Sequence, residues 1–188
     1  ALDLIKFLKT TPKAYRKLIA DLSDTVEDKL CAQQYGDINY SHVPSIAASR
    51  YQATFKRHDS ERYSQYKNDL ITGQNGAKIN ANAIYPHDVI RPLNNGVGDT
   101  DIIKAQWDAL PNYIGNAMVL PMCDVSGSMG CEIDSSGLTA MDICVSLGMY
   151  LADKNTGPFK DCFLTFSGKS KINVLRGNIV EKYRQLTN

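Results

Sequence analysis

The sequence predicts an α/β protein, in which an all-helical region over residues 1–93 precedes the first half of a doubly wound, Rossmann-like sheet over residues 116–188. Three observations support this prediction. Apolar residues recur at helical spacing through the first half, a short continuous apolar run starts at residue 117, and a helical pattern with two strand-like runs follows it. Residues 94–115, which begin with NNGVGD, are predicted to form a linker and a connecting helix.

The charge balance and the cysteines exclude several classes of protein. With 21 Lys and Arg against 20 Asp and Glu, the net charge of +1 gives no overall attraction to nucleic acid or to membranes. No apolar run reaches the roughly 18 residues that span a bilayer, and no signal-peptide pattern opens the chain, so we expect no membrane partner and a cytoplasmic location. The five cysteines form no C-x-x-C pair, which favours reduced thiols over disulfides or a zinc site.

Two helices are predicted before the break at Tyr35. The first covers residues 2–8, where apolar residues share one side. The second begins where Thr11 can cap it and Pro12 can occupy its first turn. Apolar residues at helical spacing continue it toward Tyr35, so we expect one long helix.

Residues 44–73 are predicted to form a helical hairpin, in which Pro44 opens the first helix, Asp59 caps the second and Gly73 ends it. This hairpin holds the main concentration of basic and aromatic residues. Cations can bind phosphates and rings can stack on bases, so the mixture is compatible with RNA binding. Aromatic residues at helical spacing are more often core, and a packed helix pair with a solvated basic edge is the alternative. The candidate RNA-binding residues are Arg50, Lys56, Arg57, Arg62, Tyr63 and Lys67.

Two shorter helices are expected between the hairpin and the sheet. One lies within residues 83–93, bounded by Pro86 and Pro92. After the NNGVGD linker, Asp99 or the threonine that follows it caps another helix, which Pro111 ends.

The most informative stretch is residues 116–130, NAMVLPMCDVSGSMG. The apolar run over residues 117–123 suits a strand buried on both faces of a parallel sheet, and the loop after such a strand is where open α/β sheets bind ligands. Asp124, Ser126 and Ser128 lie on that loop. One carboxylate and two hydroxyls supply part of the oxygen shell that a hard cation prefers, so we predict a site for Mg²⁺, or for Mn²⁺ or Ca²⁺.

Other functions of this loop are less well supported. A nucleophile elbow, G-x-S-x-G, is excluded because position 126 is serine. A catalytic Asp124 is disfavoured because the acidic residue expected two positions later is that same serine. An ordinary turn, in which Asp124 and the serines bond backbone donors ahead of a helix, is the structural alternative. No general base is spaced to serve a nucleophile, so we expect no enzymatic activity.

The remaining residues are predicted to form one covering helix, a hairpin and a last helix. Residues 139–142, TAMD, resemble a capping box at the start of a helix over residues 138–153. Two strands joined by the turn SGKS follow, and then a helix. Their predicted bounds are 161–166 and 171–175 for the strands, and 178–186 for the helix.

The string DVSGSM after an apolar strand resembles the metal-ion-dependent adhesion site of von Willebrand factor A (vWA) domains. The resemblance implies that Asp124, Ser126 and Ser128 hold the ion together with a Thr and an Asp from later loops. It also implies that an acidic residue of a protein partner fills the open coordination position. In the family those later loops lie more residues beyond Ser128 than this chain provides, so the site is expected to be incomplete here.

The helical region resembles the domain-of-unknown-function family 2828 in the strings KAYRKLIADL, VPSIAASRYQATFKRHDSERY and AKINANAIYPHDVI. Members of that family join such a region to a vWA-like domain, an arrangement similar to the TROVE module of Ro ribonucleoproteins. The resemblance to Ro-type proteins implies helical repeats that bind small structured RNAs, which supports the RNA hypothesis by analogy.

Three functions are therefore considered. The leading hypothesis is a non-enzymatic binding module whose metal loop recruits a protein partner. The alternatives are an RNA-binding ribonucleoprotein component and a structural assembly or scaffold protein. The motif strand is expected at an open edge of the sheet, so we predict that the missing half of the sheet comes from the rest of the protein or from another chain.

Overall fold

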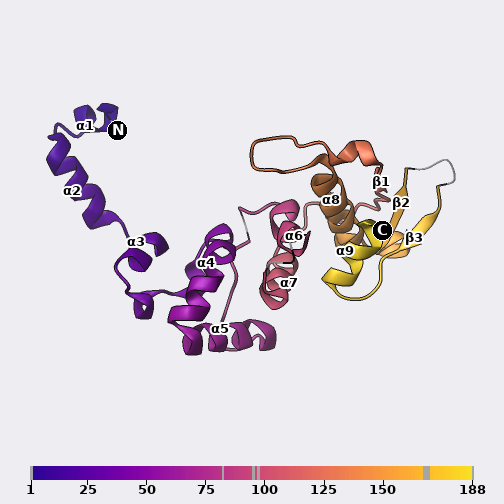
Figure 1. Ribbon diagram of the computed structural model, residues 1–188, viewed down its shortest axis with the longest axis horizontal. Coiled ribbons are helices and arrows are strands. Elements are labelled where there is room, and N and C mark those ends of the chain that lie inside the picture. Colours follow the sequence, from indigo (N-terminus) through magenta and orange to yellow (C-terminus); the bar gives the residue numbers. More distant parts are fainter. Residues whose placement is uncertain (1, 82, 95, 97, 167–169, 188) are drawn as a thin grey trace. The chain divides into compact units, whose positions relative to one another are not determined.

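The computed structural model describes residues 2–81, 83–94, 96, 98–166 and 170–187, and the chain divides into two compact units, Ala1–Asn39 and Tyr40–Asn188 (Figure 1). The first unit is helical. The second contains helices and a three-stranded sheet, so the predicted α/β class is confirmed. Within the described residues, no helix has both the length and the apolar character that crossing a membrane requires.

In its described part, residues 2–39, the first unit contains three short helices in place of the two that were predicted. Thr11 caps the second by accepting a hydrogen bond from the backbone N–H of Ala14 at 3.2 Å. The prediction of a single long helix is wrong, because Thr25 and Asp28 form a capping box that starts a new helix after Ser23. Apolar residues keep their helical spacing across this break, so the spacing does not indicate that one helix ends and another begins. The helices are α1 (Leu2–Phe7), α2 (Pro12–Leu22) and α3 (Val26–Cys31), followed by the 3-10 turn η1 (Tyr35–Asp37).

The second unit opens with the 3-10 turn η2 (Tyr40–His42) and four helices. The predicted pair of packed helices is confirmed, and Gly73 ends it with a left-handed φ of 68°. The predicted cap is wrong, because the carboxylate of Asp59 bonds Tyr40 and Arg62 and makes no capping hydrogen bond to the second helix. Asp99 caps the last helix by accepting from the backbone N–H of Asp101 at 3.1 Å. Pro92 was expected to bound a helix, but it lies inside one. The helix tolerates this proline because it ends two residues later and therefore loses little of its hydrogen bonding. The helices are α4 (Ser45–His58), α5 (Ser60–Thr72), α6 (Pro86–Asn94) and α7 (Thr100–Asp108).

The sheet has the strand order β1-β2-β3, with β1 (Met122–Cys123) at one edge. β1 runs parallel to β2 (Cys162–Thr165), with Met122 opposite Leu164. β2 pairs antiparallel with β3 (Ile172–Val174), so the predicted hairpin is confirmed. The residues 167–169 of its SGKS turn lie outside the described part of the chain.

The central helix of the second unit is α8 (Ala140–Lys154), which packs against α6, β1, β2 and α9 (Ile179–Thr187) (Figure 1). Its predicted capping box is confirmed, since Asp142 N–H donates to Thr139 Oγ1 and Thr139 N–H donates to the Asp142 carboxylate. Its buried face contributes Val145, Met149 and Ala152, each at most 1% exposed, to the core of this unit.

The predicted length of the strand over residues 117–123 is wrong, because only the last two of these residues pair with β2. Pro121 has no N–H to donate to a ladder. Instead, the buried side chain of Asn155 bonds the segment: it accepts from the N–H of Val119 at 3.3 Å and donates to the carbonyls of Val119 and Phe159. The side chain of Asn155, at the end of α8, thus provides hydrogen bonds that a neighbouring strand would otherwise provide.

Asn155→Ala should lower the free energy of unfolding by about 2 kcal/mol, because several backbone groups would lose their hydrogen bonds inside the protein. Urea unfolding monitored by circular dichroism measures the change. Asn173→Ala is the control, since the amide of Asn173 bonds a carbonyl at an exposed site. Equal losses in the two variants would contradict the role given to Asn155.

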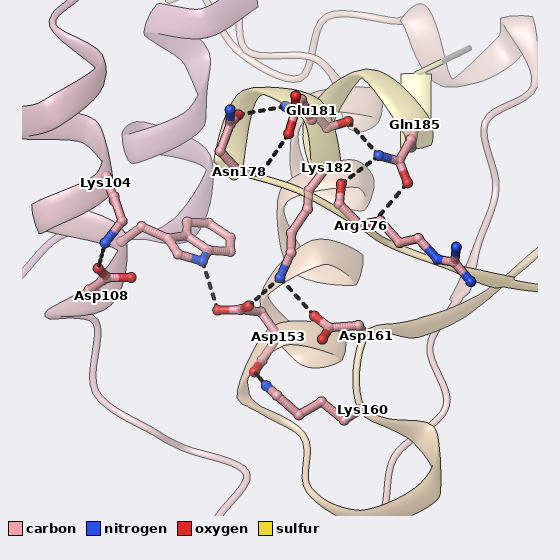
Figure 2. A network of polar contacts seen from close by, with 11 residues as sticks. Lys104, Asp108, Asp153, Lys160, Asp161, Arg176, Asn178, Glu181, Lys182 and Gln185 are labelled. Carbon is pink, nitrogen blue, oxygen red and sulfur yellow. Dashed lines mark hydrogen bonds and ion pairs between the residues drawn. The ribbon is translucent and has the colours of Figure 1, made fainter.

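A lysine of α9 forms ion pairs that connect this helix to other elements of the second unit (Figure 2). Lys182 Nζ donates to Asp153 at the end of α8 and to Asp161 before β2, in both cases at 2.7 Å. Trp107 of α7 donates its indole N–H to the same Asp153 at 3.0 Å. Three helices and the start of a strand therefore meet at two carboxylates.

Candidate metal site

The loop with the predicted ligands begins directly after β1 and leads into the 3-10 turn η3 (Gly127–Gly130), which packs against α8. β1 ends at Cys123, which is 1% exposed, and Asp124 is the first residue beyond it. The buried strand end fixes where the loop starts, while Ser126 and Ser128 are exposed. The loop is thus anchored at its base and open to solvent.

The structure brings the three predicted ligands together. Asp124 Oδ1 accepts a hydrogen bond from the backbone N–H of Ser126 at 2.9 Å. The hydroxyl oxygens of Ser126 and Ser128 lie 2.9 Å apart, and either can donate to the other. One carboxylate and two hydroxyls therefore converge on one small region of the loop.

These bonds keep the Asp124 carboxylate charged. The backbone N–H of Ser126, and then its side chain, hold the pKa of Asp124 below its usual range. A cation at this loop would meet a carboxylate that is already deprotonated at neutral pH. Its binding would release no proton from Asp124.

The spacing of the oxygens fits the coordination of a small divalent cation. Ligands of octahedral Mg²⁺ lie at about 2.0–2.1 Å from the ion, which places neighbouring ligands about 2.9 Å apart. Ser126 and Ser128 already have that spacing. Among the described residues, no three His, Cys, Asp or Glu side chains group in a way that could hold a metal ion. The fit thus depends on serine hydroxyls beside one carboxylate.

A second loop with a related turn follows the candidate site. Residues 131–140 fold back on themselves, with Ile133 N–H donating to Leu138 O and Ala140 N–H donating to Cys131 O. At the tip, Asp134 accepts from the N–H of Ser136, as Asp124 does from that of Ser126, and it also accepts from the Ser136 hydroxyl. Arg91 of α6 donates to the carbonyl of Ser136 at 2.9 Å. This tip has an Asp-x-Ser turn, and position 138 is leucine where the candidate site has its second serine.

The structure engages several candidate RNA-binding residues in internal contacts. Lys56 and Lys67 both donate to the carboxylate of Asp99, whose side chain is 7% exposed. Burial alone would raise the pKa of Asp99, but the two lysines outweigh it and lower that pKa. Arg62 pairs with Asp59 at 2.8 Å. These cations hold α4, α5 and the start of α7 together.

Tyr63 belongs to an aromatic cluster in the core. It is 3% exposed and lies at 5.2 Å from the ring of Tyr40 and 5.6 Å from that of Phe55. A ring buried on both faces has no surface on which a base could stack in this conformation. Arg50 and Arg57 are exposed. The structure therefore places the six candidates in different environments.

An apolar cavity of about 770 Å³ lies beside the segment that leads to β1. Val119, Leu147 and Leu151 line the side formed by that segment and α8. The exposed rings of Tyr85 and Tyr113 lie at the same cavity. Sequence reasoning missed it, because its walls come from four separate stretches of the chain.

Two family models match parts of the chain, and the first of them covers more than half of it. Residues 6–117 match the model of a family described as domain of unknown function DUF2828, and residues 118–188 match that of domain of unknown function DUF7788. The uncharacterized protein L728 of Acanthamoeba polyphaga mimivirus is 26% identical over 195 residues, which cover 93% of this chain. The chain spans 32% of the length of that relative. No solved structure gives a match.

Proposed function

The chain belongs to the DUF2828 family, and from this premise we propose that it is a non-enzymatic binding module whose vWA-like second half recruits a protein partner through a divalent cation. Asp124, Ser126 and Ser128 would hold the cation. When bound, Mg²⁺ supplies a Lewis-acidic position to which an acidic side chain of the partner can add its oxygen. The protein residues orient the ion and leave part of its coordination shell free.

The 2.9 Å separation of the Ser126 and Ser128 hydroxyl oxygens, with the Asp124 carboxylate beside them, carries this proposal. An ordinary turn explains the hydrogen bond from the Ser126 N–H, but it does not require a second hydroxyl at the same point. In the related turn, the carboxylate of Asp134 accepts its hydrogen bonds from a single serine, Ser136. The additional hydroxyl oxygen of Ser128 distinguishes the candidate site from the related turn, and it makes the loop better suited to bind a cation.

The edge position of β1 supports the second part of the proposal. Met122 is 58% exposed, and the apolar cavity lies along the preceding segment. We propose that the missing half of the sheet, from the rest of the protein or from another chain, covers this edge. The RNA-binding alternative has less support, because Lys56, Lys67 and Arg62 are paired with carboxylates and Tyr63 is buried.

Titration of the protein with Mg²⁺ tests the metal site. We expect saturable binding by isothermal titration calorimetry and a Tm that rises with Mg²⁺ concentration by mass action. Asp124→Ala should weaken binding by about 100-fold, because it removes the charged ligand, and Ser128→Ala by about 10-fold. A glutamate-containing peptide should bind the wild type only when Mg²⁺ is present.

Asp134→Ala is the matched control for that experiment, since it deletes the carboxylate of the related turn in the next loop. It should leave Mg²⁺ affinity unchanged. Wild-type protein that binds no Mg²⁺, or equal effects of Asp124→Ala and Asp134→Ala, would overturn the metal site and leave the scaffold function as the better account.

A further inference from the structure

The helices α1 and α2 of the first unit expose most of their apolar side chains. Among residues 3–37, the structure buries no side chain. Phe7 at the end of α1 is 82% exposed, Leu22 at the end of α2 is 72% exposed, and Leu4 and Leu8 are exposed as well. A stretch of this length cannot bury enough apolar surface to form a core by itself. Another surface is therefore needed to cover these residues.

The apolar side chains of α2 share one face of the helix. They recur at the spacing i, i+3, i+4 and i+7, at Tyr15, Leu18, Ile19 and Leu22. The cations of this helix lie on the opposite face and are all exposed: Lys13, Arg16 and Lys17. The helix thus has an apolar face and a basic face.

Positive charge is concentrated in this part of the chain. Residues 2–22 contain five Lys and Arg against two Asp, whereas the whole chain has 21 Lys and Arg against 20 Asp and Glu. The overall charge predicts no attraction to membranes, but that prediction does not apply to this segment. An exposed apolar face with cations around it is complementary to a surface that combines apolar material with negative charge.

We propose that α1 and α2 bind the surface of a membrane that contains anionic lipids. The apolar face of α2 enters the boundary between the headgroups and the acyl chains, and its cations lie near the anionic headgroups. A helix is about 10–12 Å across, so even the cations on its polar face stay within about one Debye length of the lipid surface. The helices lie on the membrane and do not cross it.

The charges and the two helices favour a lipid surface over the other ways of covering this face. A second copy of the chain would bring the cations of two α2 helices together, and like charges across an interface oppose association. A groove on a protein accommodates one helix. Here two consecutive helices expose apolar residues, and a lipid surface can accommodate both. This inference does not rest on the proposed function, because it requires no divalent cation.

Sedimentation of the protein with lipid vesicles tests the proposal, in a buffer that contains EDTA. We expect binding to phosphatidylcholine vesicles that contain about 30% phosphatidylserine to be at least about 10-fold tighter than binding to phosphatidylcholine alone. The binding should weaken as the salt concentration rises, because salt screens the attraction. Absence of binding, or equal binding to both kinds of vesicle, would overturn the proposal.

A substitution on the apolar face tests the contact with the acyl region. Leu18→Asp should weaken vesicle binding by about 10- to 100-fold, because a leucine no longer leaves water on binding. No residue of α2 is buried, so the variant should keep its fold, which circular dichroism verifies. Ile71→Asp is the matched control, since Ile71 is 63% exposed in α5 of the second unit. Equal losses in both variants would contradict the assignment to α2.

A reversal of charge tests the electrostatic part. Lys13→Glu combined with Lys17→Glu should weaken binding to the anionic vesicles by at least about 30-fold. Arg50→Glu combined with Arg57→Glu changes the net charge by the same amount at exposed sites of the second unit and should have a smaller effect. If the two double variants lose equal affinity, overall charge rather than α2 determines the binding.

Hydrogen exchange measured by mass spectrometry locates the contact in the wild type. With anionic vesicles, exchange should slow over residues 3–22 and stay unchanged over residues 40–188. A soluble helical peptide of leucine and glutamate serves as a probe for an acidic protein partner. Protection of residues 3–22 by this peptide, without protection by the vesicles, would overturn the proposal in favour of such a partner.

Discussion

Gly148→Ala is expected to lower the free energy of unfolding by about 3 kcal/mol, although alanine is the better helix former by about 1 kcal/mol. The added Cβ would overlap the sulfur of Cys123, which is 1% exposed and backed by the core. In a close-packed interior, the sulfur cannot move away from the added Cβ without displacing the atoms behind it. The strain of the overlap therefore exceeds the gain in helix propensity.

Urea unfolding of single and double variants measures this effect. Cys123→Ala removes the overlapping sulfur, so the double variant should be more stable than Gly148→Ala alone, with a coupling of about 2 kcal/mol. Gly36→Ala is the control, because no atom lies within 4 Å of its added Cβ and its φ is not positive. A Gly148→Ala protein as stable as the wild type would show that β1 can move away from α8.

Local signals in the sequence predicted most of the helices. The Thr139 and Asp142 capping box, the cap at Asp99 and the glycine at position 73 each act within one turn of the chain, so a short window of residues contains the whole cause. The same reasoning failed at residues 23–25. There, apolar spacing continued through a break that Thr25 and Asp28 impose with their side chains.

The contacts that decide the rest join residues far apart in the sequence. Asn155 bonds both backbone groups of Val119 from the end of α8, at a position where pairing with a neighbouring strand was expected. Asp99 was identified as a helix cap, but its pairing with Lys56 and Lys67 depends on how α4, α5 and α7 pack. The three residues of the candidate metal site could be proposed from the sequence because all of them lie within five positions of one strand.

Lys182→Met should lower the free energy of unfolding by about 2–3 kcal/mol. Loss of one partner from a buried ion pair costs about 3–5 kcal/mol, and the residual exposure of 15–24% at these side chains reduces that figure. Methionine keeps the apolar stem but removes the ammonium group that bonds both Asp153 and Asp161. Lys104→Met is the control in the same region (Figure 2), because its pair with Asp108 is 66% and 57% exposed and should contribute less than about 0.5 kcal/mol.

The difference in stability between the wild type and Lys182→Met should depend on pH in a defined direction. Burial would raise the pKa of Asp153, but Lys182 and Trp107 outweigh it and lower that pKa, so its contribution is present above the usual carboxyl range and is lost as pH falls through the lowered value. Burial would lower the pKa of Lys182, but its two carboxylate partners raise it, so its contribution persists through neutral pH and is lost only as pH rises through the raised value. Unfolding measured from pH 3 to pH 9 should therefore give a constant difference above about pH 5 that shrinks below about pH 4. A difference that is the same at acid and neutral pH would show that Lys182 stabilises α9 through its apolar stem rather than through its charge.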